Sequence, residues 1–177
     1  MTETPVPSRR LAAVPAPSLR EATDADRALL AELLAGLSPA SAYQRFLTGR
    51  SAPTQGLLTA LLPERPAGGA ILAFLGAELV GHALWARLPD TAAAEIAIVV
   101  ADRHQRRGIG TALARAVLDD LALQEVGRVE VFSSTDNRAV ARMIARQAPG
   151  ARRELDGPTT TWSFPAPSGS SALPRTA

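Results

Sequence analysis

Cysteine is absent from the 177-residue sequence, which excludes disulfides, thiolate metal ligands and a cysteine nucleophile. Because the chain also has only two histidines, we expect no metal site. A chain without cysteine is typical of a reducing compartment, so the expected location is the cytoplasm.

Lysine is absent as well, so all 19 basic residues are arginines, whose guanidinium groups stay charged at physiological pH. A phosphate-binding loop of the Walker A type needs a lysine and is therefore excluded. The formal net charge is only +2, and the arginines are scattered without interleaved aromatic residues. This distribution argues against a nucleic-acid partner.

Long apolar runs are missing too. No segment approaches the roughly 20 apolar residues of a membrane-spanning helix. The arginine pair Arg9-Arg10 is followed by prolines and charges instead of the apolar stretch of an export signal. We therefore expect no membrane partner. Aromatic residues make up 4% of the chain, so the expected core is aliphatic.

Prolines and small polar residues dominate both ends of the chain. Residues 1–17 contain four prolines and predict a flexible arm, and residues 165–177 predict a disordered tail. Between them, residues 18–164 show the hydrophobic periods of both helices and strands and predict one mixed α/β domain. Strands are expected at 18–22, 70–75, 79–88, 94–100, 128–134, 151–155 and 159–164, and helices at 23–36, 38–46, 56–62, 109–121 and between Asn137 and Pro149.

The most informative stretch runs from Ala94 to Leu121. Its first part, 94–100, is aliphatic on both faces, as in a strand buried on both sides, and 109–121 is apolar on one helical face. The loop between them carries two arginines and two glycines. It offers backbone N–H groups, positive charge and a helix N-terminus in one place, which suits a phosphate. A dinucleotide fingerprint is excluded because its third glycine position is Leu113.

The loop sequence Gln105-Arg106-Arg107-Gly108-Ile109-Gly110-Thr111 resembles the pyrophosphate loop of the GNAT superfamily of acyl-CoA N-acyltransferases. Segments 37–46 and 94–102 are similar to those of bacterial GNAT domains of the protein lysine acetyltransferase type, and the resemblance spans about residues 18–164. It implies a single GNAT-like domain. In that fold a mixed, largely antiparallel sheet is flanked by helices and splays between its middle two strands.

The resemblance also implies acetyl-CoA as co-substrate. By position, the backbone of Ile98, Val99 and Val100 would pair with the pantetheine arm, and the loop from Gln105 to Thr111 would hold the pyrophosphate. Asn137 would touch the lower arm of the cofactor. A backbone N–H near Ile98 is placed to meet the oxyanion that forms at the thioester carbonyl.

Glu95 is the one charged residue of the strand. An alkyl amine with a pKa of about 10.4 must lose a proton before it attacks a thioester. In the lysine acetyltransferases that this chain resembles, a glutamate at this strand position is the general base, which implies that role for Glu95. A solvated glutamate at a strand end is the alternative that the sequence leaves open.

One position departs from the family pattern. Many GNAT enzymes have a tyrosine seven residues after the asparagine, as the acid that protonates the leaving thiolate, and here that position is Ile144. Two functions therefore stay open: an N-acetyltransferase for a primary amine, either a protein lysine or a small molecule, and a non-catalytic acyl-CoA-binding domain. The sequence identifies neither the amine nor the general acid, and it leaves open whether the chain forms a homodimer.

Overall fold

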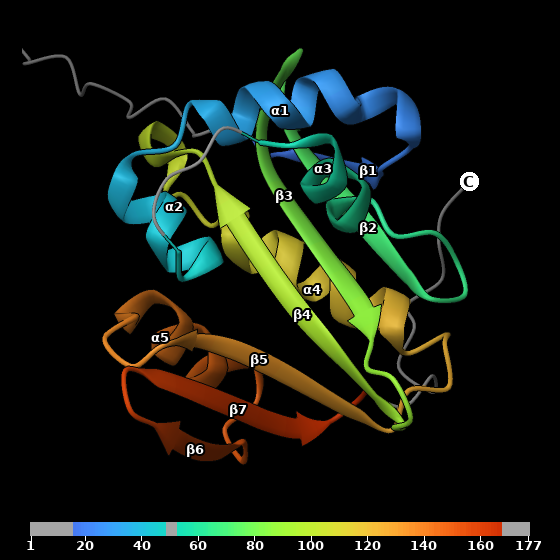
Figure 1. Cartoon of the computed structure of the whole chain (residues 1–177), viewed down its shortest axis with the longest axis vertical. Helices are drawn as coiled ribbons and strands as arrows, with labels where there is room; N and C mark the ends of the chain where they lie inside the picture. Colours follow the sequence, from blue (N-terminus) through green and yellow to red (C-terminus); the bar gives the residue numbers. More distant parts are fainter. Residues whose placement is uncertain (1–15, 49–52, 168–177) are drawn as a thin grey trace, which may run out of the picture.

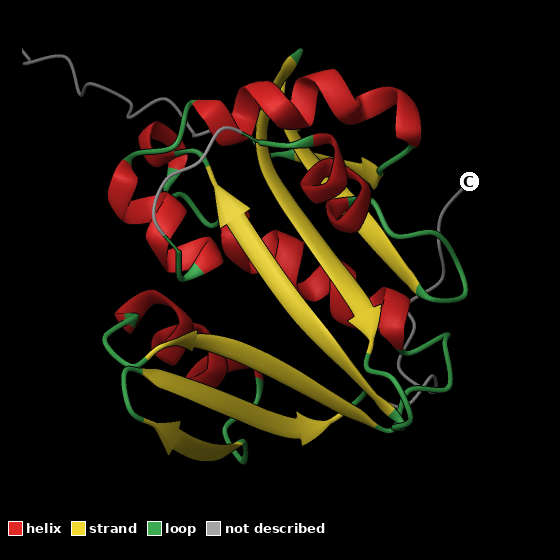
Figure 2. Cartoon of the chain, in the orientation of Figure 1, coloured by secondary structure: helices red, strands yellow, loops and turns green. Residues whose placement is uncertain are grey.

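The computed structural model describes residues 16–48 and 53–167, which form a seven-stranded sheet with helices on both faces (Figure 1, Figure 2). The order across the sheet is β1-β2-β3-β4-β5-β7-β6. Most of the predicted arm and tail lies outside the described residues.

The sheet is mixed and largely antiparallel, as expected. Only β4 and β5 run parallel, and every other neighbouring pair is antiparallel. Each strand lies within about two residues of its predicted position. The strands are β1 (Ser18–Glu21), β2 (Gly68–Leu75), β3 (Glu78–Arg87), β4 (Ala93–Val100), β5 (Arg128–Ser134), β6 (Arg152–Asp156) and β7 (Thr159–Pro165).

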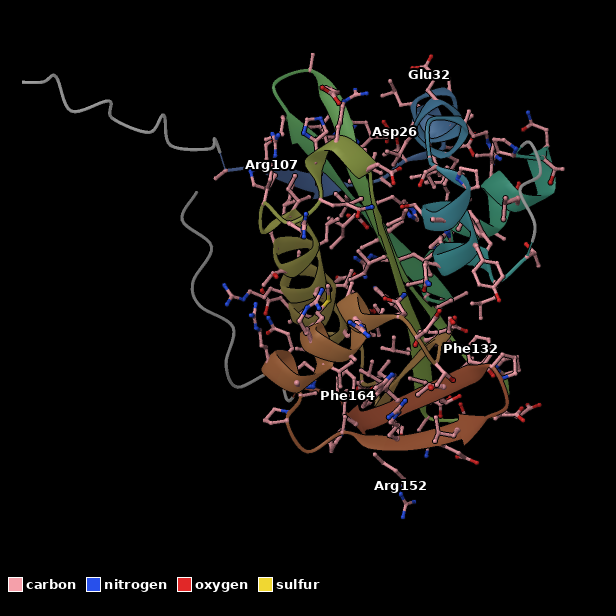
Figure 3. All side chains as sticks on the ribbon, turned by 90° about the vertical axis from the view of Figure 1, so that its left-hand side faces the viewer. Asp26, Glu32, Arg107, Phe132, Arg152 and Phe164 are labelled. Carbon is pink, nitrogen blue, oxygen red and sulfur yellow. The ribbon has the colours of Figure 1, made fainter. Side chains whose placement is uncertain are left out.

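Five α-helices cover the sheet in two layers. When the sheet is seen edge-on, α1, α2 and α3 lie on one side, and α4 and α5 lie on the other (Figure 3). The helices are α1 (Arg27–Ala35), α2 (Pro39–Phe46), α3 (Gln55–Leu61), α4 (Ile109–Leu121) and α5 (Arg138–Gln147). A short 3-10 turn, Asp102–His104, connects β4 to the loop before α4.

Capping residues explain where the first helices begin. Thr23 and Asp26 form a capping box at the 3-10 turn that leads into α1, and Arg20 donates two hydrogen bonds to the Asp26 carboxylate. In α2, the Ser38 hydroxyl accepts a hydrogen bond from the Ser41 N–H at 3.2 Å. A cap of this kind satisfies a backbone donor that has no partner in the first turn.

Two aliphatic cores lie on opposite faces of the sheet. On one face, leucines of α1 and α3 pack against Leu72 and Leu84 of the sheet. On the other, the predicted apolar face of α4 packs against Val80 and Trp85. Trp85 is fully buried and donates its indole N–H to the Asp120 carboxylate at 2.6 Å. It therefore belongs to the core and lies away from any ligand surface.

The sheet opens between β4 and β5. These strands are in register at Ala93–Arg128, Ala94–Val129 and Glu95–Glu130 and then diverge (Figure 1). The divergence leaves the C-terminal halves of both strands apart from each other. This opening positions the candidate site.

Candidate active site

Beyond Glu95, β4 pairs with no other strand of the described residues on the side of the opening. Its other side stays paired with β3 as far as Val100. A free strand edge of this kind presents backbone donors and acceptors that can pair with an extended ligand. The edge faces the opening over its whole length (Figure 1).

The β3–β4 register decides which residues present their backbone to the opening. Ala101 donates its N–H to Val80 O at 2.9 Å, and successive residues of a strand point their backbone groups alternately to its two neighbours. The backbone of Val99 therefore pairs with β3, whereas that of Ile98 and Val100 points into the opening. Of the predicted residues 98–100, Ile98 and Val100 are thus the two whose backbone points into the opening, a distinction that cannot be read from a run of aliphatic residues.

The side chain of Gln105 is used inside the protein. Its Nε2 donates to Val100 O at 3.1 Å and to the Ser41 hydroxyl at 3.0 Å. The Val100 carbonyl is therefore already bonded, which leaves the N–H of Val100 and the N–H and C=O of Ile98 for a ligand. The side chain of Gln105, which was predicted as part of the cofactor-binding loop, thus joins that loop to α2.

The loop before α4 exposes backbone donors at a helix N-terminus. Ala112 is the first residue to donate a hydrogen bond within α4, to Gly108 O at 3.0 Å. The N–H groups of Ile109, Gly110 and Thr111 consequently have no intrahelical partner. Gly108, the N-cap, has a φ of +84°, a left-handed conformation that favours glycine. Free N–H groups at a positive helix end form a site suited to a phosphate.

Neighbouring side chains place this loop at the mouth of the opening. Arg106 and Arg107 are exposed, and the Arg107 side chain extends outward from the loop (Figure 3). A Cβ on Gly110 would lie 3.4 Å from Met143 of α5 and 3.8 Å from Val100 of β4. The start of α4 therefore lies where the end of β4 meets α5, next to the free strand edge.

Glu95 lies on the side of the sheet covered by α2. Its neighbours at alternate positions, Ala97 and Val99, belong to the core beneath α1, α2 and α3, and alternation puts the Glu95 side chain on the same face. Burial raises the pKa of the half-buried carboxyl, the positive charge of Arg45 opposes that rise, and Glu130 adds to it. A carboxyl with a raised pKa is better matched to proton transfer near neutral pH.

Arg45 of α2 was not identified as a site residue by the sequence analysis, although segment 37–46 contains it. Its Nε is buried and has no hydrogen-bond partner among residues 16–48 and 53–167. Burial lowers the pKa of its guanidinium to about 10, and the nearby Glu95 carboxylate raises it in part. Arg45 therefore remains charged at neutral pH and acts electrostatically on Glu95.

Glu130 of β5 is a second residue that the sequence analysis did not identify. It lies opposite Glu95 at the last paired position of the two strands. Phe132, two residues along, projects on the α2 side of the sheet (Figure 3), and alternation puts Glu130 on that side as well. Its Oε1 accepts from Arg128 Nε at 3.1 Å and lies 3.0 Å from a terminal guanidinium nitrogen of Arg128. The alternation of polar and apolar residues in 128–134 indicates that Glu130 lies on the polar face of its strand. Its position opposite Glu95 is known only from the tertiary structure.

Asn137, the predicted site residue that follows β5, lies at the start of α5. Asn137 caps α5, because its Oδ1 accepts the Val140 N–H at 3.1 Å. The preceding residue, Asp136, accepts hydrogen bonds from Ser134 and from Gln44 of α2. Ile144 is buried within α5, and its hydrocarbon side chain has no group that could protonate a thiolate.

Across residues 16–48 and 53–167, no group of three or more histidine, aspartate or glutamate side chains is placed to hold a metal ion. The helices of the same ranges include none with the length and apolarity to cross a membrane.

Comparisons with known proteins agree with this geometry. The model of the acetyltransferase (GNAT) family matches residues 40–148, more than half of the chain. No curated protein matches the sequence significantly.

Solved structures show the same fold. The GNAT domain of PAT from S. lividans has a TM-score of 0.76 at 18% identity, with 84% of this chain and 90% of that chain covered. An acetyltransferase from Thermus thermophilus has a TM-score of 0.63 at 28% identity, covering 86% and 99%. RimL, a ribosomal L7/L12 alpha-N-protein acetyltransferase in complex with coenzyme A, has a TM-score of 0.68 at 19% identity, covering 86% and 96%.

Proposed function

The chain belongs to the acetyltransferase (GNAT) family, and we propose that its domain at 18–164 transfers an acetyl group from acetyl-CoA to a primary amine. One observation carries the proposal: a free strand edge, a helix N-terminus with unpaired N–H groups, and a carboxylate meet at a single opening in the sheet. The RimL structure supports the choice of cofactor, because that fold relative is a coenzyme A complex.

The chain's own groups suit the parts of acetyl-CoA. The pyrophosphate is proposed to lie against the N–H groups of Ile109, Gly110 and Thr111, with Arg106 and Arg107 supplying positive charge. The pantetheine amides would pair with the edge of β4 in the manner of an added strand. Asn137 is proposed to lie close to the lower arm through its side-chain amide.

Glu95 is proposed to take the proton from the acceptor ammonium, directly or through a water molecule. The neutral amine then attacks the thioester carbonyl, forming the C–N bond while the C–S bond breaks. The N–H of Ile98 points into the opening and is a donor for the oxyanion. The first ammonium proton goes to Glu95, and the attacking nitrogen loses its second proton to solvent as the amide forms. The thiolate takes its proton from a donor other than residue 144, where the buried side chain is Ile144.

The acceptor is proposed to be either a protein amine or a small-molecule amine. RimL, one of the structural relatives, acts on the α-amino group of a ribosomal protein, so protein amines are among the acceptors of this fold. The absence of cysteine favours direct transfer in a ternary complex over an acyl-cysteine intermediate. It also supports the proposed location in the cytoplasm.

A direct assay tests the proposal. Thiol release from acetyl-CoA is followed over a panel of amines, with the wild-type protein, Glu95→Gln and the matched control Glu154→Gln in the exposed edge strand β6. We expect Glu95→Gln to lower kcat/KM by about 10²- to 10⁴-fold, the usual contribution of a general base, and the control to match wild type. Undiminished turnover in Glu95→Gln removes Glu95 from this role.

A second candidate, a non-catalytic acyl-CoA-binding domain, is favoured by the buried Ile144 at the expected acid position. It predicts stabilisation by acetyl-CoA of about 2.7 kcal/mol at a hundredfold excess over the dissociation constant, with no thiol release for any amine. Turnover of one amine excludes it.

A further inference from the structure

A hydrogen-bonded cluster joins α2 to the start of the proposed acyl-CoA loop. The Asp102 carboxylate accepts the Ser38 N–H at 2.9 Å and the hydroxyls of Ser38 and Ser41, both at 2.7 Å. Burial alone would raise the pKa of Asp102, but these hydrogen bonds lower it overall. The carboxylate is therefore charged at neutral pH, and hydrogen bonds to a charged acceptor are the stronger kind.

The same cluster includes the first residue of the loop. The Gln105 N–H donates to Asp102 O at 3.3 Å, and its side-chain amide donates to the Ser41 hydroxyl and to Val100 O. The end of β4, the loop and the N-terminus of α2 are thus held as one unit.

The other end of α2 is attached to the opposite side of the opening. Gln44 Nε2 donates to Asp136 Oδ1 at 3.4 Å, and Asp136 lies in the turn after β5, directly before Asn137. In Figure 1, α2 lies beside the wide end of the gap between β4 and β5. The helix therefore bridges the two strands on the side that Glu95 faces.

The bridge matters because α2 carries Arg45, whose charge acts on Glu95. A helix of eight residues has little stability of its own, since nucleation is costly and short helices are marginal in water. Its position therefore depends on its attachments and on packing by residues such as Ala42. A shift of the loop can therefore be transmitted to Arg45, and so to Glu95, through those attachments.

From these contacts we propose that Asp102 is a positioning residue: through Ser38 and Ser41 it couples acyl-CoA binding at 105–111 to the placement of α2, and hence of Arg45, beside Glu95. The inference rests on the proposed function, because the loop must bind acyl-CoA. Since coupling between two sites is reciprocal in binding free energy, acyl-CoA strengthens amine binding and the amine strengthens acyl-CoA binding.

Hydrogen exchange of the full chain, with and without acetyl-CoA, tests the coupling. In wild type we expect acetyl-CoA to increase the protection of both 105–111 and 39–46. Ser41→Ala removes the hydroxyl that contacts both Asp102 and Gln105 but changes no residue of the loop 105–111. In this variant, acetyl-CoA should still increase the protection of 105–111 and should no longer increase that of 39–46. Asp24→Ala, which removes an exposed ion pair with Arg27, is the matched control and should keep both.

Steady-state kinetics give a second readout. We expect Ser41→Ala and Asp102→Ala to raise KM for each substrate about tenfold at a saturating concentration of the other, within the usual range of coupling between sites. The Kd of acetyl-CoA for the free protein should change less than twofold in Ser41→Ala. A tenfold change in that Kd, unchanged KM values, or unchanged protection of 39–46 in wild type overturns the inference. If acetyl-CoA protects neither segment, the proposed function fails and the inference with it, whereas protection of 105–111 alone removes only the inference.

Discussion

Glu95 of β4 and Glu130 of β5 lie opposite each other at the last paired position before the two strands separate. Both side chains lie on the face covered by α2, and the Arg45 guanidinium acts on Glu95 from that helix. The like charge of Glu130 raises the pKa of Glu95, and the nearby cation of Arg45 lowers it. The protonation of the proposed base is therefore set by residues from three separate elements.

Replacing Glu130 with glutamine should lower the pKa of Glu95, because a like charge is removed. Activity that needs ionised Glu95 declines as the pH falls through this pKa, so the acidic limb of the kcat/KM profile should move to lower pH. The profile is measured from mildly acidic to mildly basic pH with a good acceptor. Glu154→Gln on β6 serves as the control and should leave the acidic limb of the profile at its wild-type pH. A shift of this limb to higher pH in Glu130→Gln contradicts the proposed repulsion between Glu95 and Glu130.

Replacing Arg45 with glutamine should have the opposite effect. Loss of the cation raises the pKa of Glu95, so the acidic limb moves to higher pH and the rate at neutral pH falls. Arg45→Lys keeps the charge and should restore part of the wild-type profile. Damage to packing alone would not shift the limb in opposite directions in the Arg45 and Glu130 variants, so shifts of the same sign would sink this account.

Gly108→Ala should lower the free energy of unfolding by about 1–2 kcal/mol, the usual cost of a left-handed conformation for a residue with a Cβ. The space around Gly108 is open, so conformation and not steric overlap is the cause. Gly56 of α3 is equally open but lacks a positive φ. Gly56→Ala should therefore stabilise by up to about 1 kcal/mol. Urea denaturation of both variants checks the contrast, and equal effects of the two substitutions speak against it.

Asp120→Ala should destabilise the protein by about 1–3 kcal/mol, because it leaves the buried indole N–H of Trp85 without its acceptor. The same carboxylate also receives Arg65 at 2.8 Å. Asp119, its exposed neighbour in α4, is the matched control, and Asp119→Ala should stay within about 0.5 kcal/mol of wild type. Equal unfolding midpoints for the two variants would show that the Trp85 contact contributes nothing.

His82 predicts a pH dependence of stability. It is fully buried, with Nε2 2.8 Å from Leu61 O; burial, together with the charge of Arg45, lowers its pKa from 6.5 to about 4 despite that hydrogen bond. Because the folded state disfavours the protonated form of His82, this residue leaves the free energy of unfolding unchanged above pH 6.5 and lowers it as the pH falls from there toward 4. His82→Gln should reduce the pH dependence of the free energy of unfolding over this range of pH. An unchanged slope excludes His82 as its cause.

Local patterns in the sequence were enough to predict most of the helices and strands. The apolar periods place α4 and the strands within about two residues of their positions in the structure. The Asp156-Gly157 turn predicts the β6–β7 hairpin, and Gly157 has the expected positive φ of 53°. These predictions succeed because each depends on residues a few positions apart, where backbone conformation and side-chain spacing are decided locally.

The loop from Gln105 to Thr111 and the carboxylate of Glu95, which remain predicted site residues, lie in one continuous stretch of sequence. Only the tertiary structure decided that the backbone of Val99 faces β3, that the side chain of Gln105 bonds α2, and that Glu130 and Arg45 surround Glu95. Strand register and helix placement follow from packing between segments distant in sequence: Ser38 and Asp102 are 64 residues apart. No local periodicity encodes such a contact, because its partners are brought together by the packing of segments far apart in the sequence.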